Sequence, residues 1–279
     1  MKIMITGAGG MLGQRLVEEF SARHSVQALS HRQLDITSMR RVRERVFDSG
    51  PDWILHAAAF TRVDEAETQF EKAYRVNAVG TRNLASAAFA NHCALLYYST
   101  DYVFDGKSGR PYREWDPPSP VNAYGASKLA GEVYVCSLCP AHLIIRTSWL
   151  FGPGGVNFVN KVVERCRSGA ELRMVDDQRG SPTYTLDLAR ISRLLVEGNK
   201  RGTYHVTNSG HCSWYELARK IVELKALATA VTPVPASEYP VAAKRPAYSV
   251  LENCLLTLEK VPPLRSWQDA IAEYLGGPG

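Results

Sequence analysis

The amino-acid sequence predicts an α/β protein with a doubly wound parallel sheet, followed by a smaller C-terminal substrate-binding part. Apolar, strand-like runs at about residues 2–6, 25–29, 52–56, 93–98 and 142–146 alternate with amphipathic stretches of helical length. Beyond Arg146 this alternation weakens, and Gly and Pro residues divide the chain into shorter pieces. We therefore expect a first domain at residues 1–148 and a second at residues 149–279, from which some elements return to the first.

Composition excludes several classes of protein. The 279 residues are 45% hydrophobic and 22% charged, which is ordinary for a globular enzyme and unlike a disordered chain. The net charge of +5 is spread along the sequence rather than gathered in one basic run, so we expect no nucleic-acid partner. No run of 18 apolar residues occurs, and the N-terminus resembles a core strand rather than a secretion signal. We expect a cytoplasmic protein without a membrane partner.

The six cysteines indicate neither disulfides nor a metal centre. Cys136 and Cys139 form a Cys-x-x-Cys, but no second pair lies at the spacing of a zinc site. Free buried thiols are the simpler interpretation, and we expect no metal.

A glycine-rich loop follows the first predicted strand and opens a helix. Its sequence is Gly-Ala-Gly-Gly-Met-Leu-Gly at residues 7–13. Glycines alone could simply make a turn, but the order of strand, loop and helix is typical of a Rossmann dinucleotide site, where the helix N-terminus binds the pyrophosphate. The Gly-x-x-Gly-x-x-Gly spacing is that of the short-chain dehydrogenases. We expect cofactor contacts from Gly7, Gly10, Met11, Leu12 and Gly13.

The end of the second predicted strand bears on the choice of cofactor. The chain reads Ser30-His31-Arg32, without the acid that would hold the ribose 2′-hydroxyl of NAD. Ser30 and Arg32 suit a 2′-phosphate, so the sequence favours NADPH, with NADH as the alternative cofactor and a solvated surface charge as the alternative role for Arg32. Asp35 and Ile36 follow closely and are expected to border the adenine.

Tyr124 and Lys128 lie four residues apart, which places both on one face of a helix. Carbonyl reduction needs a proton donor, and a tyrosine exchanges its proton more readily beside a cation. This spacing also occurs by chance on solvated helices. Here, however, it follows a predicted strand that ends in Ser99-Thr100-Asp101, which offers a hydroxyl for a substrate carbonyl. We assign that hydroxyl to Thr100, with Ser99 as the alternative.

The sequence resembles the extended or atypical short-chain dehydrogenases, and within them the dTDP-4-dehydrorhamnose reductase family. The resemblance spans nearly the whole chain. Besides the loop and the Tyr-Lys pair, it rests on residues 34–37, 56–64, 99–106, 146–152, 157–158, 177–183 and 245–251. It implies NADPH-dependent reduction of the 4-keto group of dTDP-4-dehydro-L-rhamnose to dTDP-L-rhamnose, the last step in making that activated sugar for polysaccharide.

The resemblance also implies roles for individual residues. Tyr124 would donate the proton, Lys128 would bind the ribose and tune Tyr124, and Thr100 would lie beside the keto oxygen. Small side chains at Ala57, Ala58 and Ala59 would line the cofactor. The residues expected to contact the nucleotide sugar are Thr61, Val63, Asp101, Trp149, Asn157, Arg179 and Arg245, the two arginines through the diphosphate. Without the resemblance, Trp149 would be interpreted as an ordinary core aromatic.

Two departures from the family pattern and two rival functions remain. His56 stands where the family often has Asn, and we expect a hydrogen-bonded core histidine rather than a catalyst. The glutamates that hold magnesium-linked dimers in some members are not evident, so a homodimer stays open. One rival is a non-catalytic relative such as the regulatory subunit of methionine adenosyltransferase. The other is an epimerase or dehydratase, because Asp101 follows Thr100 directly.

Overall fold

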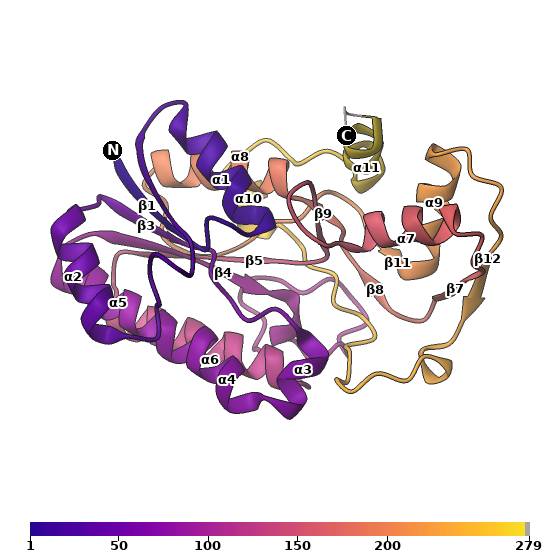
Figure 1. The fold of residues 1–279 in the computed structure, drawn as a ribbon, viewed down its shortest axis with the longest axis horizontal. Helices are drawn as coiled ribbons and strands as arrows, with labels where there is room; N and C mark the ends of the chain where they lie inside the picture. Colours follow the sequence, from indigo (N-terminus) through magenta and orange to yellow (C-terminus); the bar gives the residue numbers. More distant parts are fainter. Residues whose placement is uncertain (277–279) are drawn as a thin grey trace.

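The computed structural model describes residues 1–276, and its centre is a parallel sheet of six strands in the order β10-β5-β4-β3-β1-β2 (Figure 1). Five of the strands match the runs expected from the sequence, while the sixth, β10, comes from the second half of the chain. The predicted doubly wound α/β fold is confirmed. The strands are β1 (Lys2–Thr6), β2 (Ser25–Leu29), β3 (Trp53–His56), β4 (Ala94–Thr100), β5 (His142–Thr147) and β10 (Gly202–His205).

Helices cover both faces of this sheet, which is why the central strands β3 and β4 are buried along their whole length. Successive residues of β4 point to opposite faces: Leu96 and Tyr98 pack into one core, and Leu95 and Tyr97 into the other. The first core is closed by α1 (Met11–Ser21), α8 (Thr185–Glu197) and α10 (Cys254–Leu258). The second is closed by α2 (Met39–Ser49), α5 (Thr81–Ala90) and α6 (Ala123–Leu138).

Short helical pieces lead from β3 and β4 toward the helices. After β3 come α3 (Val63–Thr68), α4 (Phe70–Tyr74) and a π-helical turn, η1 (Arg75–Gly80), which continues into α5. A single 3₁₀ turn, η2 (Asp101–Val103), follows β4 directly. Both irregular turns lie close to α6, the helix that carries Tyr124 and Lys128.

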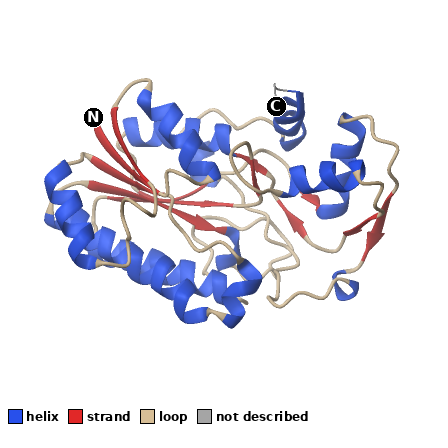
Figure 2. Ribbon diagram, viewed as in Figure 1, coloured by secondary structure: helices blue, strands red, loops and turns tan. Residues whose placement is uncertain are grey.

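The second part of the chain forms a smaller unit with its own core, which includes Phe151, Leu217, Ile221 and Trp267 (Figure 2). Its strands make three short pairs: β6 with β9, β7 with β12 and, antiparallel, β8 with β11. Its elements are β6 (Leu150–Phe151), α7 (Phe158–Arg167), β7 (Leu172–Val175), β8 (Arg179–Gly180), β9 (Thr183–Tyr184), β11 (Cys212–Ser213), α9 (Trp214–Leu224), β12 (Val231–Val234), η3 (Ala236–Glu238) and α11 (Trp267–Gly276).

The structure bears on two expectations, the state of the cysteines and the lack of a membrane-spanning helix. All six cysteines are free; four are buried as expected, but Cys136 is exposed and Cys254 half-buried, because they lie on outer faces of α6 and α10. Within residues 1–276, none of the helices is long and apolar enough to cross a membrane.

Candidate active site

The candidate site lies at the carboxyl edge of the sheet, where β4 and β5 end side by side. Register pairs Thr100 with Thr147, the last residues of these strands. The strand β4 ends two residues later than the sequence indicated, since Ser99 and Thr100 still pair with β5. Ligands of doubly wound proteins bind at this edge of the sheet.

Thr100 and Asp101 are both buried at this edge. Thr100 begins η2: its Oγ1 accepts a hydrogen bond from Tyr102 N (3.2 Å) and donates one to Asp101 Oδ1 (3.0 Å). Burial raises the pKa of Asp101 to about 7, against the opposing effect of hydrogen bonds from Ser249 and Thr100. Asp101 therefore changes charge near neutral pH.

The start of α6 places Tyr124 against this edge. Asn122 begins the helix, and its Oδ1 accepts from Gly125 N (2.7 Å). At Gly125 a Cβ would lie 2.1 Å from the Tyr102 carbonyl oxygen, so only glycine lets the helix approach η2 this closely. As a result the ring of Tyr124 meets that of Tyr102 edge to face, with centroids 6.0 Å apart.

Lys128 lies one turn further along α6 and is buried. Its Nζ donates to the carbonyl oxygen of Tyr98 (2.6 Å) and lies 4.1 Å from the centre of the Tyr97 ring. Burial lowers the pKa of Lys128 to about 7, although Glu132 opposes the shift. The lysine is thus a charge that can be lost near neutral pH.

Burial also raises the pKa of Tyr124, and the neighbouring Asp101 adds to the effect, while the Thr100 hydroxyl that faces the phenol opposes it. The phenol consequently keeps its proton at neutral pH. A protonated phenol, an adjacent hydroxyl and an ammonium one helical turn away can together protonate an oxyanion formed between them.

The glycine loop has the shape that a dinucleotide requires. Gly7 has a positive φ of 73°, and a Cβ there would lie 2.5 Å from Ala58 N; at Gly13 a Cβ would lie 2.1 Å from the Gly7 carbonyl oxygen. Gly10 begins α1 without a side-chain cap. The first N–H groups of α1, from Met11 and Leu12, are accordingly available to a phosphate. The loop therefore fits the pyrophosphate of a dinucleotide.

The other predicted cofactor residues lie beside this loop. The loop leaves β1, and its strand neighbours are β2, which leads into Ser30 and Arg32, and β3, which leads into Ala57, Ala58 and Ala59. Arg32 is exposed, and the Ser30 hydroxyl donates to Gln33 Oε1 (2.7 Å). Asp35 Oδ1 accepts from both the backbone and the hydroxyl of Thr37, while Ile36 is buried against Gly80.

On the substrate side, Trp149 is the residue with the least ordinary backbone. It follows the end of β5 by two residues, and its φ is 47°, a left-handed conformation that bulky residues rarely adopt. Its ring stacks on Trp214, with centroids 3.5 Å apart and planes at 7°. The backbone of Trp149 therefore lies two residues beyond Thr147, the strand partner of Thr100, while its ring packs against the second part of the chain.

The remaining predicted substrate residues are held by other parts of the chain. Arg179 Nη1 lies 3.3 Å from Glu216 Oε2. Arg245 forms a bidentate ion pair with Asp64, with Nη2 2.7 Å from Oδ2 and Nη1 3.2 Å from Oδ1. Asn157 is buried; it caps α7 through Asn160 N and donates to the Gly152 carbonyl (2.9 Å). Thr61 is exposed just before α3, which begins at the half-buried Val63.

Several residues that shape the site carry no recognisable signal in the sequence. Asn77 lies in the π-helical turn and binds the backbone of Phe60 at both N (2.8 Å) and O (3.0 Å), and also Ser127 Oγ (3.0 Å). Asp64 and Tyr102 meet Arg245 from α3 and η2. Only their neighbours in space reveal these roles.

His56 and the pair Glu132–Arg146 complete the buried polar groups near α6. His56 is fully buried between the hydroxyls of Thr6 (2.9 Å) and Thr81 (3.0 Å), and burial lowers its pKa to about 3. It is the hydrogen-bonded core histidine that we expected. Arg146 Nη2 binds Glu132 Oε2 at 2.7 Å, both side chains being 6% exposed. Among residues 1–276, no group of three or more acidic, His or Cys side chains is arranged to hold a metal.

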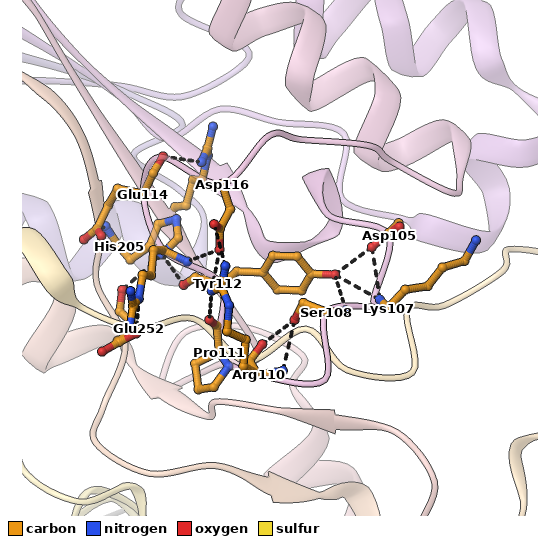
Figure 3. Close-up of polar contacts among 12 residues, drawn as sticks. Asp105, Lys107, Ser108, Arg110, Pro111, Tyr112, Glu114, Asp116, His205 and Glu252 are labelled. Atoms are coloured by element: carbon orange, nitrogen blue, oxygen red, sulfur yellow. Dashed lines mark hydrogen bonds and ion pairs between the residues drawn. The ribbon is translucent and has the colours of Figure 1, made fainter.

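A polar network fixes the segment between η2 and α6 (Figure 3). The Tyr112 hydroxyl donates to Asp105 Oδ1 (2.7 Å) and accepts from Lys107 N (3.0 Å). On the other side, His205 Nδ1 lies 3.1 Å from the Tyr112 carbonyl oxygen. These contacts anchor the segment to β10, so that both η2 and the start of α6 are held in place.

A dinucleotide-type sheet with a Tyr-x-x-x-Lys helix at its carboxyl edge defines the class of short-chain dehydrogenases. More particularly, the chain belongs to the family described as "RmlD substrate binding domain", which matches residues 1–277. The resemblance inferred from the sequence is thereby confirmed.

Relatives with named functions match almost the whole chain. The spore coat polysaccharide biosynthesis protein SpsK of Bacillus subtilis is 42% identical over 98% of this chain and 96% of its own. A dTDP-4-dehydrorhamnose reductase of Streptomyces griseus is 41% identical over 97% of this chain and 91% of its own. The crystal structure of dTDP-4-dehydrorhamnose reductase from Bacillus anthracis in complex with NADP is 40% identical, with a TM-score of 0.96 over 98% of both chains.

Proposed function

We propose that this protein is an NADPH-dependent reductase that converts the 4-keto group of dTDP-4-dehydro-L-rhamnose into the hydroxyl of dTDP-L-rhamnose. The observation that carries the proposal is the meeting of Thr100, Tyr124 and Lys128 at the carboxyl edge of the sheet, beside a loop shaped for a dinucleotide. The relatives named dTDP-4-dehydrorhamnose reductase, one of them in complex with NADP, support the same substrate and cofactor. A cytoplasmic location is part of the same proposal, because the relatives are named as enzymes that act on dTDP-linked sugars.

In this proposal the cofactor lies along the loop and the neighbouring strand ends. The N–H groups of α1 after Gly10 bind the pyrophosphate, Arg32 and Ser30 bind the 2′-phosphate, and the alanines at 57–59 leave room for the dinucleotide. Asp35 and Ile36 border the adenine. Bound NADPH supplies the hydride.

The chain's own residues supply the proton and hold the substrate oxygen. The Thr100 hydroxyl turns from Asp101 toward the keto oxygen and orients it. Tyr124 then gives the phenolic proton to that oxygen, and the Lys128 ammonium stabilises the phenolate that remains. The raised pKa of Tyr124 suits this direction, because a donor must hold its proton until the oxyanion forms.

In this proposal the sugar is enclosed by residues from both parts of the chain. Trp149 forms a wall beside Thr147, and Asp101 lies next to Thr100. Thr61 and Val63 border the site from the start of α3, and Asn157 shapes the loop that follows Gly152. In this proposal Arg179 and Arg245 bind the diphosphate, although each already pairs with a carboxylate.

One observation favours an epimerase or dehydratase as a second candidate. Asp101 follows Thr100, and burial raises its pKa to about 7, so that it can act as an acid. Those enzymes return the hydride to their substrate and regenerate the cofactor, whereas a reductase consumes one NADPH per product. Stoichiometry therefore distinguishes the two.

The test is the fall in NADPH absorbance when the purified protein meets dTDP-4-dehydro-L-rhamnose. We expect one NADPH oxidised per sugar, and a loss of roughly 10²- to 10⁴-fold in kcat for Tyr124→Phe. Tyr134→Phe removes a hydroxyl from the same helix further from the edge and should leave kcat unchanged. Tight NADPH binding without oxidation in the wild type would refute the proposal and favour the regulatory type of relative.

A further inference from the structure

Trp149 is held in a strained conformation at the candidate sugar wall. A bulky residue with φ of 47° lies in a sparsely populated, unfavourable region of backbone conformation, so surrounding contacts must hold it there. Such strain is most often kept at functional sites. The question is therefore which neighbours fix the position of its ring.

Two neighbours confine the Trp149 ring from different sides. Trp214 covers one face almost in parallel, with centroids 3.5 Å apart. At Gly180 a Cβ would lie 2.3 Å from Trp149 Cε2, so the Gly180 backbone closes the edge of the ring. Trp214 is itself packed against Phe158, at 4.6 Å between centroids. The ring of Trp149 is thus fixed by residues of α9, β8 and α7.

The start of α9 makes Trp214 a firm support. Ser213 begins the helix, with Oγ accepting from Glu216 N (3.0 Å), and Glu216 Oε2 accepts from Ser213 N (2.8 Å) in return. Trp214 is the first residue of the helix and is therefore locked by this reciprocal cap. The same Glu216 carboxylate also binds Arg179, the other predicted substrate residue of this region.

We propose that Trp214 is a positioning residue for the keto-sugar, acting by stacking on Trp149 and holding that ring just beyond the end of β5, the strand that pairs with β4 at Thr100. The inference rests on the proposed function and deepens it, because it identifies what sets the affinity for the sugar. Trp214 itself does not touch the reacting atoms. Its removal should weaken the site for the sugar and leave the site for NADPH intact, since the glycine loop lies at the end of β1 and shares none of these contacts.

The experiment compares steady-state kinetics of the full chain with each substrate varied in turn. For Trp214→Ala we expect the KM for dTDP-4-dehydro-L-rhamnose to rise about tenfold, while the KM for NADPH stays within about twofold. Trp214→Phe keeps a ring to stack on and should restore most of the affinity. Trp115→Ala removes a surface tryptophan, 58% exposed, and is the matched control expected to change neither KM.

Two further variants separate positioning from simple loss of packing. Gly180→Ala pushes on the edge of the Trp149 ring rather than on the face that Trp214 covers, and should raise the sugar KM although the Trp214 side chain is kept. In a Trp149→Ala background, Trp214→Ala should cause no further rise in the sugar KM. The effects of two substitutions are not additive when one residue acts through the other. Thermal melting of each variant shows whether it is folded.

The outcomes are distinguishable. An active wild type whose sugar KM is unchanged by Trp214→Ala would overturn this inference alone, as would an equal rise in both KM values. Fold-changes that multiply in the double variant would show that Trp214 does not act through Trp149, and would overturn it as well. A wild type that oxidises no NADPH with the sugar would overturn the proposed function together with this inference.

Discussion

The cofactor side and the substrate side of the site are built in different ways. The cofactor side is contained in one unbroken segment, residues 7–13, and in the ends of neighbouring strands. The substrate side joins segments far apart in sequence, as in the ion pair between Asp64 and Arg245, 181 residues apart. If the proposed assignment holds, binding of the dinucleotide depends on local backbone shape, while binding of the sugar depends on how the two parts of the chain meet.

The largest expected effect on binding comes from adding a single carbon atom to the glycine loop of the cofactor side. Gly13→Ala would put a Cβ 2.1 Å from the Gly7 carbonyl oxygen, so the loop backbone must move and the phosphate N–H groups move with it. We expect the Kd for NADPH to rise at least about 100-fold, measured by fluorescence titration. Gly9→Ala is the matched control, since no atom lies within 4 Å of its Cβ and its φ is not positive; it should stay within about threefold. Equal effects of the two substitutions would contradict the account.

The second effect concerns Lys128, where the two sides meet. Burial lowers its pKa to about 7 from its ordinary 10.5, so the ammonium is lost as pH rises through 7. We expect kcat/KM for NADPH to fall about tenfold per pH unit above that value, because this ratio reports the free enzyme. The unfolded chain keeps the proton up to about 10.5, so between these values stability contributed by this group rises with pH while activity falls.

Two variants assign that pH profile. Lys128→Met should be weakly active without the falling limb. Asp101→Asn should keep the limb, although burial raises the pKa of Asp101 into the same range. A limb that disappears in Asp101→Asn and persists in Lys128→Met would assign it to the carboxyl instead.

The smallest effect tests the long-range assembly of the substrate side. Asp64→Asn weakens the pair with Arg245 and the bond from Ala243 N (3.0 Å), which hold the segment that also bonds Asn122 at the start of α6. Because the pair is partly exposed, we expect only about a 3- to 10-fold rise in sugar KM, with NADPH KM unchanged. Glu65→Gln breaks the exposed neighbouring pair with Arg62 and should change neither. A rise in the NADPH KM for Asp64→Asn would contradict the proposal that the cofactor and the sugar are bound by separate sets of contacts.

The same contrast explains how far the sequence could be interpreted. Five strands, the glycine loop and the placement of Tyr124 and Lys128 at a strand end follow local patterns of hydrophobicity and spacing, and the structure has them there. The β10 strand was missed because its sequence, Gly-Thr-Tyr-His, lacks the apolar run that marks a strand as short as β3, Trp-Ile-Leu-His. Asn77 and the left-handed backbone of Trp149 depend on partners from other segments, which no local pattern encodes.

The partners of Arg179 and Arg245 illustrate the same limit. From the sequence, each arginine is a candidate for the diphosphate because of its chemistry alone. The structure shows that Arg179 pairs with Glu216 of α9 and that Arg245 pairs with Asp64 of α3. Each arginine therefore also joins two segments of the chain. Whether they also bind phosphate stays a prediction.

The most direct test of the central claim follows the hydride itself. NADPH carrying deuterium at the transferred position is supplied with dTDP-4-dehydro-L-rhamnose, and the product is examined by mass spectrometry and NMR. The account predicts one deuterium at C4 of the sugar for each NADPH oxidised, and almost none with Tyr124→Phe in the same time. A product without deuterium, or a changed sugar with the NADPH left unconsumed, would contradict it.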